Sequence, residues 1–295
     1  MKKILFVLPV VEDELEILQQ NLAYHMDLFS KYNLDFSFFI IIQAKNVEIH
    51  WKLIDLLSNH YVIIKCTNVF SLSVSRNFGI DYFRENSQYS HLSFIDVRTC
   101  WDAMMVQECI KLMDTELLLW TGKIGWEKNK KISFQYNKNG LLTKCVTGFV
   151  WSMVFSRNSC IPYFNINACL SNNLLQELQA GEDNLFCYTL LRRLNESRLY
   201  SCNGTVIHPS RVGEGKRIKY AKAQGAVFRY LLPRLFKMDI WYGFYMSYRF
   251  MLFVANSVVG LFLFRAGAWN VFNNRFKGFC LYRYQKLINQ GFLSK

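Results

Sequence analysis

Short apolar runs alternate with helix-like segments through the first 95 residues, and this alternation constrains the fold more than any other feature. The run FSFFIII at 36–42 is continuously apolar, as is typical of a strand buried on both faces of a parallel sheet. Further strands are predicted at 4–11, 61–65 and 91–95, with helices at 13–30, 49–57 and 73–84. This order predicts βαβ units and an α/β fold with a mostly parallel sheet between helices.

The ends of the predicted strands carry the first candidate binding residues. Ligands of parallel sheets bind outside the carboxyl ends of the strands. Pro9 and Val11 lie at the end of the first strand, and Gln43 follows the second. Asp96 and Arg98 follow the fourth strand. We therefore expect these five residues to line one edge of the sheet.

The pattern changes after residue 103. The expected elements are a helix at 104–113, a strand at 116–120, a hairpin of 131–137 with 141–147, and helices at 174–178 and 182–194. Lys138-Asn139-Gly140 supplies the hairpin turn. The chain contains neither G-x-x-x-x-G-K-[ST] nor G-x-G-x-x-G, so dedicated P-loop or dinucleotide binding is not expected.

Composition excludes several classes of protein. With 52% hydrophobic and 19% charged residues, the chain is neither disordered nor fibrous. Its nine cysteines form no CxxC pair, which argues against a zinc site and favours reduced thiols in the cytoplasm. The first apolar run meets Glu12-Asp13-Glu14 without a small-residue cleavage site, so a buried strand explains it better than a signal peptide.

Charge divides the chain into two unlike parts. Residues 211–295 hold fifteen Lys or Arg against two acids, together with 20 of the 48 aromatic residues, whereas residues 1–210 are neutral. A basic aromatic tail suits an anionic membrane surface, a nucleic acid or a helical subdomain packed on the core, and we favour the membrane surface. The uncharged run at 250–264 is 15 residues long, short of the ~20 that a spanning helix needs. An interfacial position is therefore expected, and a short span stays open.

Three islands of polar residues occur in a defined order: SVSRNFGI at 73–80, FIDVR at 94–98 and GEDNLF at 181–186. Their order and spacing resemble bacterial family-2 glycosyltransferases with the GT-A fold, of the capsule and lipopolysaccharide kind. The segment YAKAQGAVFR at 220–229, after His208-Pro209, looks like the K-x-x-G-A segment of some of these enzymes. The resemblance covers roughly residues 1–235.

The resemblance implies a nucleotide-sugar transferase domain over 1–235 and a membrane-associating helical tail over 236–295. It implies that Arg76 and Asn77 hold the donor phosphate or the loop at the sheet end, with a hydrogen bond at the helix start as an equal alternative. Many members of the family place an Asp after the second strand to contact the nucleotide; this sequence has Gln43 there, which can still hydrogen-bond a uracil edge. The acid motif makes Asp183 the candidate general base and Glu182 the second candidate. Trp151 is placed on the acceptor side, where core packing is an equal alternative.

Metal binding is a second point at which the sequence departs from the family. Asp96 matches the first acid of the Asp-x-Asp motif, but Arg98 replaces the second. Three outcomes follow: Asp96 holds Mn²⁺ or Mg²⁺ with His208, Arg98 neutralises the diphosphate without metal, or the enzyme is impaired. Asp102 is a candidate replacement carboxylate.

Together these features predict an inverting glycosyltransferase of the hexosyltransferase type with a UDP-sugar as donor. Its acceptor would be a lipid-linked oligosaccharide in the synthesis of a bacterial surface polysaccharide. The enzyme would lie peripherally on the cytoplasmic face of the inner membrane and bind no nucleic acid. The alternative is a catalytically impaired GT-A fold that serves as a scaffold or binding subunit of a polysaccharide assembly complex. A nucleic-acid-binding protein is a third alternative, motivated by charge alone.

Overall fold

The computed structural model describes residues 2–45, 61–126, 132–134, 150–164, 182–191, 199–208, 214–238, 240–263 and 268–281. The chain divides into two compact units. The first comprises Met1–Thr143, Phe149–Tyr163 and Arg193–Ser210. The second comprises Lys144–Gly148, Phe164–Arg192 and Arg211–Lys295. The domain boundary predicted between residues 235 and 236 falls inside helix α7 (Glu214–Met238), and that assignment stays a prediction.

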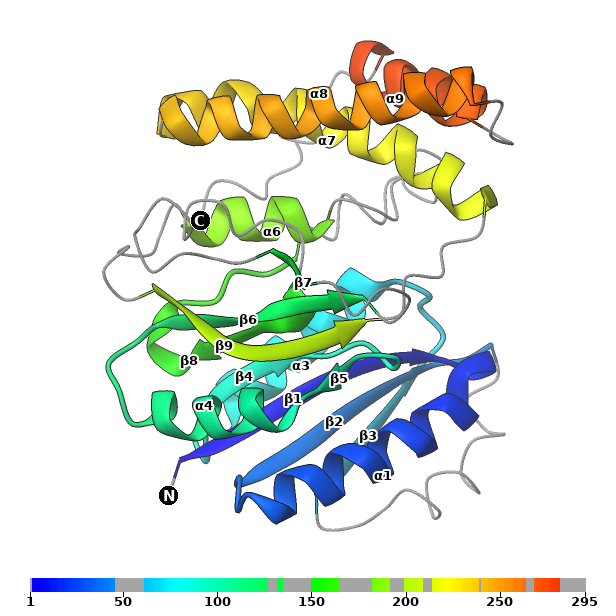
Figure 1. Ribbon diagram of the computed structural model, residues 1–295. Coiled ribbons are helices and arrows are strands. Elements are labelled where there is room, and N and C mark those ends of the chain that lie inside the picture. Colours follow the sequence, from blue (N-terminus) through cyan, green and yellow to red (C-terminus); the bar gives the residue numbers. More distant parts are fainter. Residues whose placement is uncertain are drawn as a thin grey trace. The chain divides into compact units, whose positions relative to one another are not determined.

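The first unit is built on a nine-stranded sheet within the described residues, with the order β3-β2-β1-β4-β8-β6-β9-β5 and β7 paired to β6 (Figure 1). The strands are β1 (Lys3–Val11), β2 (Phe36–Gln43), β3 (Val62–Thr67), β4 (Tyr89–Phe94), β5 (Cys100–Trp101), β6 (Leu119–Trp126), β7 (Ile132–Phe134), β8 (Met153–Ser156) and β9 (Leu199–His208). Strands β3, β2, β1 and β4 are parallel, as predicted. The remainder of the sheet is mixed, because β8, β5 and β7 run antiparallel to their neighbours while β6 and β9 are parallel.

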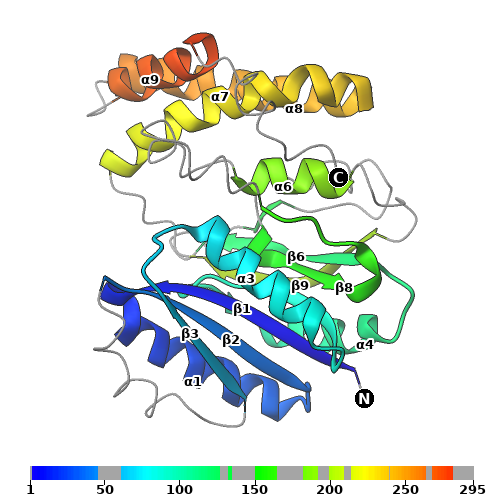
Figure 2. The ribbon, with the colours of Figure 1, turned by 180° about the vertical axis from the view of Figure 1, so that it is seen from behind.

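Helices cover both faces of this sheet. Its helices are α1 (Leu15–Lys31), α3 (Leu72–Glu85) and α4 (Ala103–Met113), with 3₁₀ turns η1 (Glu12–Glu14), η3 (Val150–Ser152) and η4 (Arg157–Ser159). On the face of the sheet that α1 and α4 cover, the hydrophobic core contains alternate residues of β1, including Phe6 and Leu8. This alternation reflects the two-residue period of a strand. Helix α3 covers the opposite face (Figure 2).

Gly79 explains how closely α3 approaches the sheet. A Cβ atom built at Gly79 would lie 2.4 Å from both Cγ atoms of Val7 on β1, so this crossing requires a glycine. Ser71 caps the start of α3 by accepting a hydrogen bond from the Val74 amide at 3.3 Å. The glycine of the first polar island therefore fixes how close the helix that carries Arg76 and Asn77 lies to the sheet.

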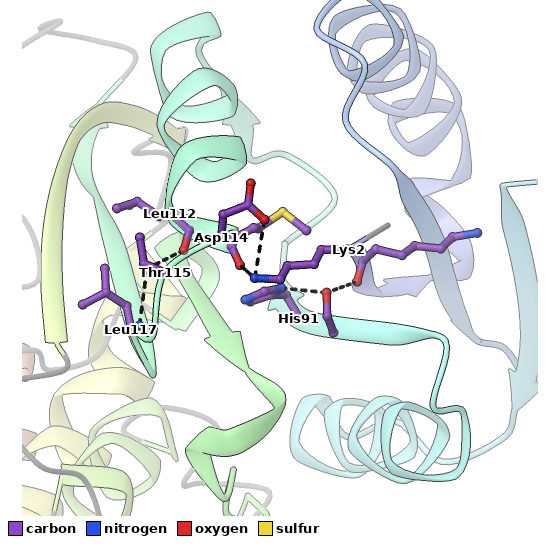
Figure 3. A network of polar contacts seen from close by, with 9 residues as sticks. Lys2, His91, Leu112, Asp114, Thr115 and Leu117 are labelled. Atoms are coloured by element: carbon purple, nitrogen blue, oxygen red, sulfur yellow. Dashed lines mark hydrogen bonds and ion pairs between the residues drawn. The ribbon is translucent and has the colours of Figure 1, made fainter.

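The amino end of the sheet carries a separate polar network (Figure 3). The Lys2 ammonium donates to the Met113 carbonyl at 2.6 Å and lies 3.4 Å from the Asp114 carboxylate. Buried His91 contacts the Ser90 hydroxyl through Nδ1 at 2.9 Å. Burial and the nearby charge of Lys2 lower the pKa of His91 to about 4, against the opposing charge of Asp114. This network ties the starts of β1 and β4 to the end of α4.

Several predicted elements differ from the structure. The strand predicted at 116–120 begins later, at Leu119, and the first turn of the helix predicted at 13–30 is the 3₁₀ turn η1. β7 pairs with β6, whereas the predicted hairpin partner at 141–147 and the helices at 49–57 and 174–178 lie outside the described residues. Strands β8 and β9 were not predicted.

The second unit contains four helices among its described residues. They are α6 (Glu182–Leu191), α7 (Glu214–Met238), α8 (Ile240–Phe262) and α9 (Ala268–Leu281). A Cβ atom at Gly225 would lie 2.1 Å from the Arg275 carbonyl oxygen, so the glycine of the K-x-x-G-A segment lets α7 and α9 pack backbone to backbone. Among the described residues, no helix is both long enough and apolar enough to cross a membrane.

Candidate active site

Asp96 is the centre of a charged cluster in the first unit. Its Oδ1 atom accepts a hydrogen bond from Arg76 Nη2 at 3.3 Å, and His208 Nε2 lies 3.5 Å from Oδ2. The Arg76 side chain is 1% exposed, whereas those of Asp96 and His208 are 28% and 26% exposed. The cluster thus anchors a carboxylate on a buried guanidinium while leaving one side open to solvent.

The environment keeps Asp96 ionised at neutral pH. Burial alone raises the pKa of this carboxyl group, but the hydrogen bond from His208 and the charge of Arg76 outweigh that effect. The pKa of Asp96 therefore lies below its ordinary value. Arg76 and His208 flank this carboxylate, one at each oxygen.

The sheet topology explains why residues so far apart in the sequence meet here. Asp96 follows β4, and the loop that it begins ends at β5, where Cys100 pairs with Ile207 of β9. His208 is the next residue after Ile207 and therefore lies beside the loop. Buried Asn21 of α1 holds this loop, because its Nδ2 donates to the Val97 and Thr99 carbonyls at 2.5 and 3.0 Å.

Arg98 points to an acidic partner rather than into the Asp96 cluster. Its Nη2 and Nε atoms lie 3.0 and 3.2 Å from Glu14 Oε1. The Arg98 side chain is 42% exposed. This pair joins the loop after β4 to η1, the turn that follows β1. The sequence did not identify Glu14 as a site residue, although three consecutive acids after the first strand were a visible signal.

The other predicted donor residues lie at the same edge of the sheet. Gln43 is buried at the end of β2, in register with Val11 of β1 and Thr67 of β3. Pro9 is buried inside β1, two residues before its end. Its missing amide hydrogen is tolerated because β1 pairs with β4 only as far as Val7. Asn77 is buried on α3 beside Arg76.

Trp151 lies in the core of the first unit and against the site. The indole is 5% exposed, and its ring centroid lies 4.8 Å from that of His208 with an interplanar angle of 31°. Such burial leaves little surface on which a sugar ring can stack. Trp151 therefore supports the orientation of His208 in this structure, and its predicted acceptor role stays a prediction.

Glu182 and Asp183 are the first two residues of helix α6 in the second unit. The helix therefore starts where the sequence predicted it. Both side chains are partly buried. Carboxylates in a first helical turn are stabilised by the exposed amide groups there. Their placement relative to Asp96, and hence their role as general base, stays a prediction.

The described residues do not fit a divalent metal on their own. Asp96 already meets Arg76 at one oxygen and His208 at the other. Asp102, the candidate replacement acid, caps α4 by accepting from the Met105 amide at 2.7 Å. Within the described part of the chain there is no group of three or more His, Cys, Asp or Glu side chains that could hold a metal. Mg²⁺ and Mn²⁺ prefer several oxygen ligands, and this cluster supplies one carboxylate with a cation beside it.

Comparisons with known proteins concern the fold. No protein-family model matches the sequence, and a search among curated proteins found no significant match. The structure of S. aureus TarS 1–349 in complex with UDP-GlcNAc matches with a TM-score of 0.53 and 11% identity, over 79% of this chain and 67% of that chain. The structure of S. aureus TarS 1–349 matches with a TM-score of 0.51 and 10% identity, over 99% of this chain and 75% of that chain.

A third structure, S. aureus TarS 1–349 in complex with UDP, has a TM-score of 0.49 and 11% identity over 77% of this chain. That match spans 65% of the TarS chain, less than two thirds of its length. At such identities, likeness bears on the fold alone. The two better matches confirm the predicted fold: the chain has an α/β fold of the GT-A type, with further helices in its C-terminal part.

Proposed function

We propose that this protein is a glycosyltransferase that transfers a sugar from a nucleoside diphosphate sugar. The observation that carries the proposal is the Asp96–Arg76–His208 cluster at the carboxyl end of β4, in a fold shared with a protein that binds UDP-GlcNAc. Buried Gln43, at the end of β2, lies at the edge where a nucleotide would bind a parallel sheet. A UDP-sugar of hexose type is the proposed donor.

The proposed reaction is a single inverting displacement. The acceptor hydroxyl oxygen attacks the anomeric carbon, and the bond from that carbon to the diphosphate oxygen breaks. The nucleoside diphosphate leaves with the electron pair, and the acceptor proton passes to Asp183, with Glu182 as the second candidate. A positioned base of this kind contributes about 10²–10⁴-fold in rate.

Charge on the leaving diphosphate has to be stabilised as it develops. We assign this task to Arg98, which is 42% exposed and paired with Glu14, with His208 beside the Asp96 carboxylate. Because both carboxylate oxygens of Asp96 already have partners, we assign stabilisation of the diphosphate to protein cations, and no step passes through a metal. A Mn²⁺ or Mg²⁺ requirement would need ligands from the donor and from water.

The proposed acceptor is a lipid-linked oligosaccharide of a bacterial surface polysaccharide, and the proposed location is the cytoplasmic face of the inner membrane. The support is compositional: residues 211–295 carry the whole net charge of +13 together with 20 aromatic residues. A membrane-bound acceptor gives such a tail a purpose, since the reacting hydroxyl lies near the bilayer.

Donor binding is the direct test. Full-length protein is titrated calorimetrically with UDP and with UDP-sugars, first in EDTA and then in Mn²⁺. We expect binding in both conditions and at least a tenfold loss for Arg98→Gln, because a charge-assisted hydrogen bond is worth about 1.5–3 kcal/mol. Lys2→Gln is the matched control, since Lys2 is 44% exposed at the opposite edge of the sheet. If no nucleotide sugar binds under either condition, the proposal is wrong.

The scaffold alternative is favoured by one observation, the Arg98–Glu14 pair at the position where the family has a second acid. A scaffold of this type can bind a donor but does not turn it over. Product formation from a bound donor, followed by mass spectrometry, separates the two functions.

A further inference from the structure

Helix α8 presents an apolar face to solvent. Eight of its exposed residues are large and apolar, and six of them share one side of the helix: Trp241, Phe244, Tyr248, Met251, Val259 and Phe262. Their exposed fractions range from 49% for Val259 to 77% for Phe262. At about 100° per residue, all six fall within an arc of roughly 80° of the helix surface. A soluble helix ordinarily carries polar residues on this arc.

The opposite face of α8 is already used inside the second unit. A Cβ atom at Gly243 would lie 2.4 Å from the Phe236 ring of α7, and Met246 is buried. The Phe250 ring lies 5.0 Å from that of Phe228 on α7 and 4.9 Å from that of Phe279 on α9. Figures 1 and 2 show α8 running beside α7 and α9. The helix is therefore fixed by its packed face, and the exposed face remains for another occupant.

Charge around this face selects the occupant. Residues 237–281 contain five basic residues and one acid, Asp239. Trp269 and Phe276 of α9 are each 60% exposed, and the exposed Lys277 follows Phe276 directly. Exposed Lys237, at the end of α7, precedes α8. Aromatic side chains mixed with Lys and Arg in a strongly basic segment are typical of helices that lie in the headgroup region of anionic bilayers.

We infer that the exposed face of α8 is a bilayer-docking surface, with the helix lying parallel to an anionic membrane and Trp241, Phe244 and Phe262 entering the boundary between headgroups and acyl chains. Lys237 and Lys277 contact the lipid phosphates. The inference deepens the proposed function, on which its biological purpose rests, because it names the surface that brings the protein to a lipid-linked acceptor. Membrane binding itself requires neither a donor nor catalysis.

The experiment uses full-length protein and vesicles of phosphatidylcholine with or without phosphatidylglycerol, in co-sedimentation without nucleotide. We expect binding to the anionic vesicles, a decrease with rising salt, and a blue shift of tryptophan emission that Trp241→Phe reduces. Phe244→Gln should weaken vesicle binding roughly tenfold, since burial of a large apolar side chain is lost. Lys237→Glu with Lys277→Glu should weaken binding to anionic vesicles and abolish much of its salt dependence.

Met104→Gln is the matched control, because Met104 on α4 is 51% exposed and Phe244 is 54% exposed. Circular dichroism confirms that each variant folds. If Phe244→Gln binds vesicles as well as Met104→Gln does, the docking surface is elsewhere. If the protein ignores vesicles and light scattering shows a dimer that Phe244→Gln dissociates, a second copy covers this face and the inference is overturned. Because donor titration is separate, either result leaves the glycosyltransferase proposal to its own test.

Discussion

His208 Nε2 lies 3.5 Å from Asp96 Oδ2 and joins the last residue of β9 to the loop after β4. The contact depends on β5, which pairs antiparallel with β9 and holds the far end of the Asp96 loop. Arg76 completes the cluster from α3, at 3.3 Å from the other carboxylate oxygen. Strand β4 and helix α3 belong to the parallel half of the sheet, and β9 belongs to the mixed half.

Arg76→Gln should destabilise the protein by about 1.5–3 kcal/mol at neutral pH, because it removes a charged hydrogen bond from the Asp96 carboxylate. The pKa of Asp96 should rise, since burial then acts with less opposition. In the wild type the pKa is depressed, so its stabilising contribution is present above the unfolded value of 3.8 and is lost as pH falls through the folded pKa. Urea unfolding across acidic pH should show that this loss is smaller in the variant. Lys3→Gln, which breaks the weaker Lys3–Asp35 pair, should change stability by less than about 1 kcal/mol.

Arg98→Asp should convert donor binding from metal-independent to Mn²⁺-dependent. The substitution restores the second acid of the motif and removes the cation that we assign to the diphosphate. Calorimetry in EDTA should show at least a tenfold loss, about 1.4 kcal/mol or more, and Mn²⁺ should recover part of it. Equal binding by the variant and the wild type in EDTA would contradict the role of Arg98.

Asp183→Asn should lower turnover by about 10²–10⁴-fold and leave donor affinity largely unchanged, because a general base acts on the acceptor proton. Single-turnover product formation and calorimetry measure the two effects separately. Undiminished turnover would transfer the role to Glu182, to be tested with Glu182→Gln.

Gly79→Ala should destabilise the protein by about 1–3 kcal/mol, although alanine is the better helix former. The added Cβ would lie 2.4 Å from both Val7 Cγ atoms, so α3 must move away from β1. Val7→Ala should rescue part of the loss in the double variant, as measured by urea unfolding. Additive destabilisation in the double variant would show that the contact with Val7 is not the cause.

His25 should make the protein less stable as pH falls from 6.5 to about 4. Its Nδ1 lies 2.9 Å from the Asn21 carbonyl oxygen, and its Nε2 accepts from the Trp101 amide at 3.4 Å, so the buried ring is neutral. Burial lowers its pKa from 6.5 to about 4, against the hydrogen bond to Asn21. Because the unfolded chain takes up the proton first, up to about 3 kcal/mol of stability is lost across this window. His25→Gln keeps a donor and an acceptor but does not titrate, so unfolding curves should flatten in that range. An unchanged pH slope would show that another group, such as His91, is responsible.

The parallel half of the sheet was predictable from the sequence alone, and so was the position of the candidate residues at the ends of its strands. The run at 36–42 is apolar at every position because β2 is buried throughout, and such a pattern is local and visible in one chain. The polar residues after these strands, among them Asp96, follow from the same rule, since parallel strands place their carboxyl ends together. Gly79 was visible in the first polar island, but its close approach to Val7 of β1 was not predicted from the sequence.

The partners of those residues were not predictable from the sequence and are known from the three-dimensional structure. Residues 199–208 show no alternation of apolar and polar residues strong enough to predict a strand. Strand β9 is stabilised by pairing with β6 on one side and β5 on the other. The position of β9 brings His208 to Asp96. The hydrogen bond from Asn21 to the loop after β4 is likewise a long-range contact. Neutralising a diphosphate was one of three outcomes predicted for Arg98. In the structure Arg98 pairs with Glu14, and local sequence does not show which of three adjacent acids is its partner. Pairing of this kind depends on distances across the fold, and hydrophobic periodicity carries no information about them.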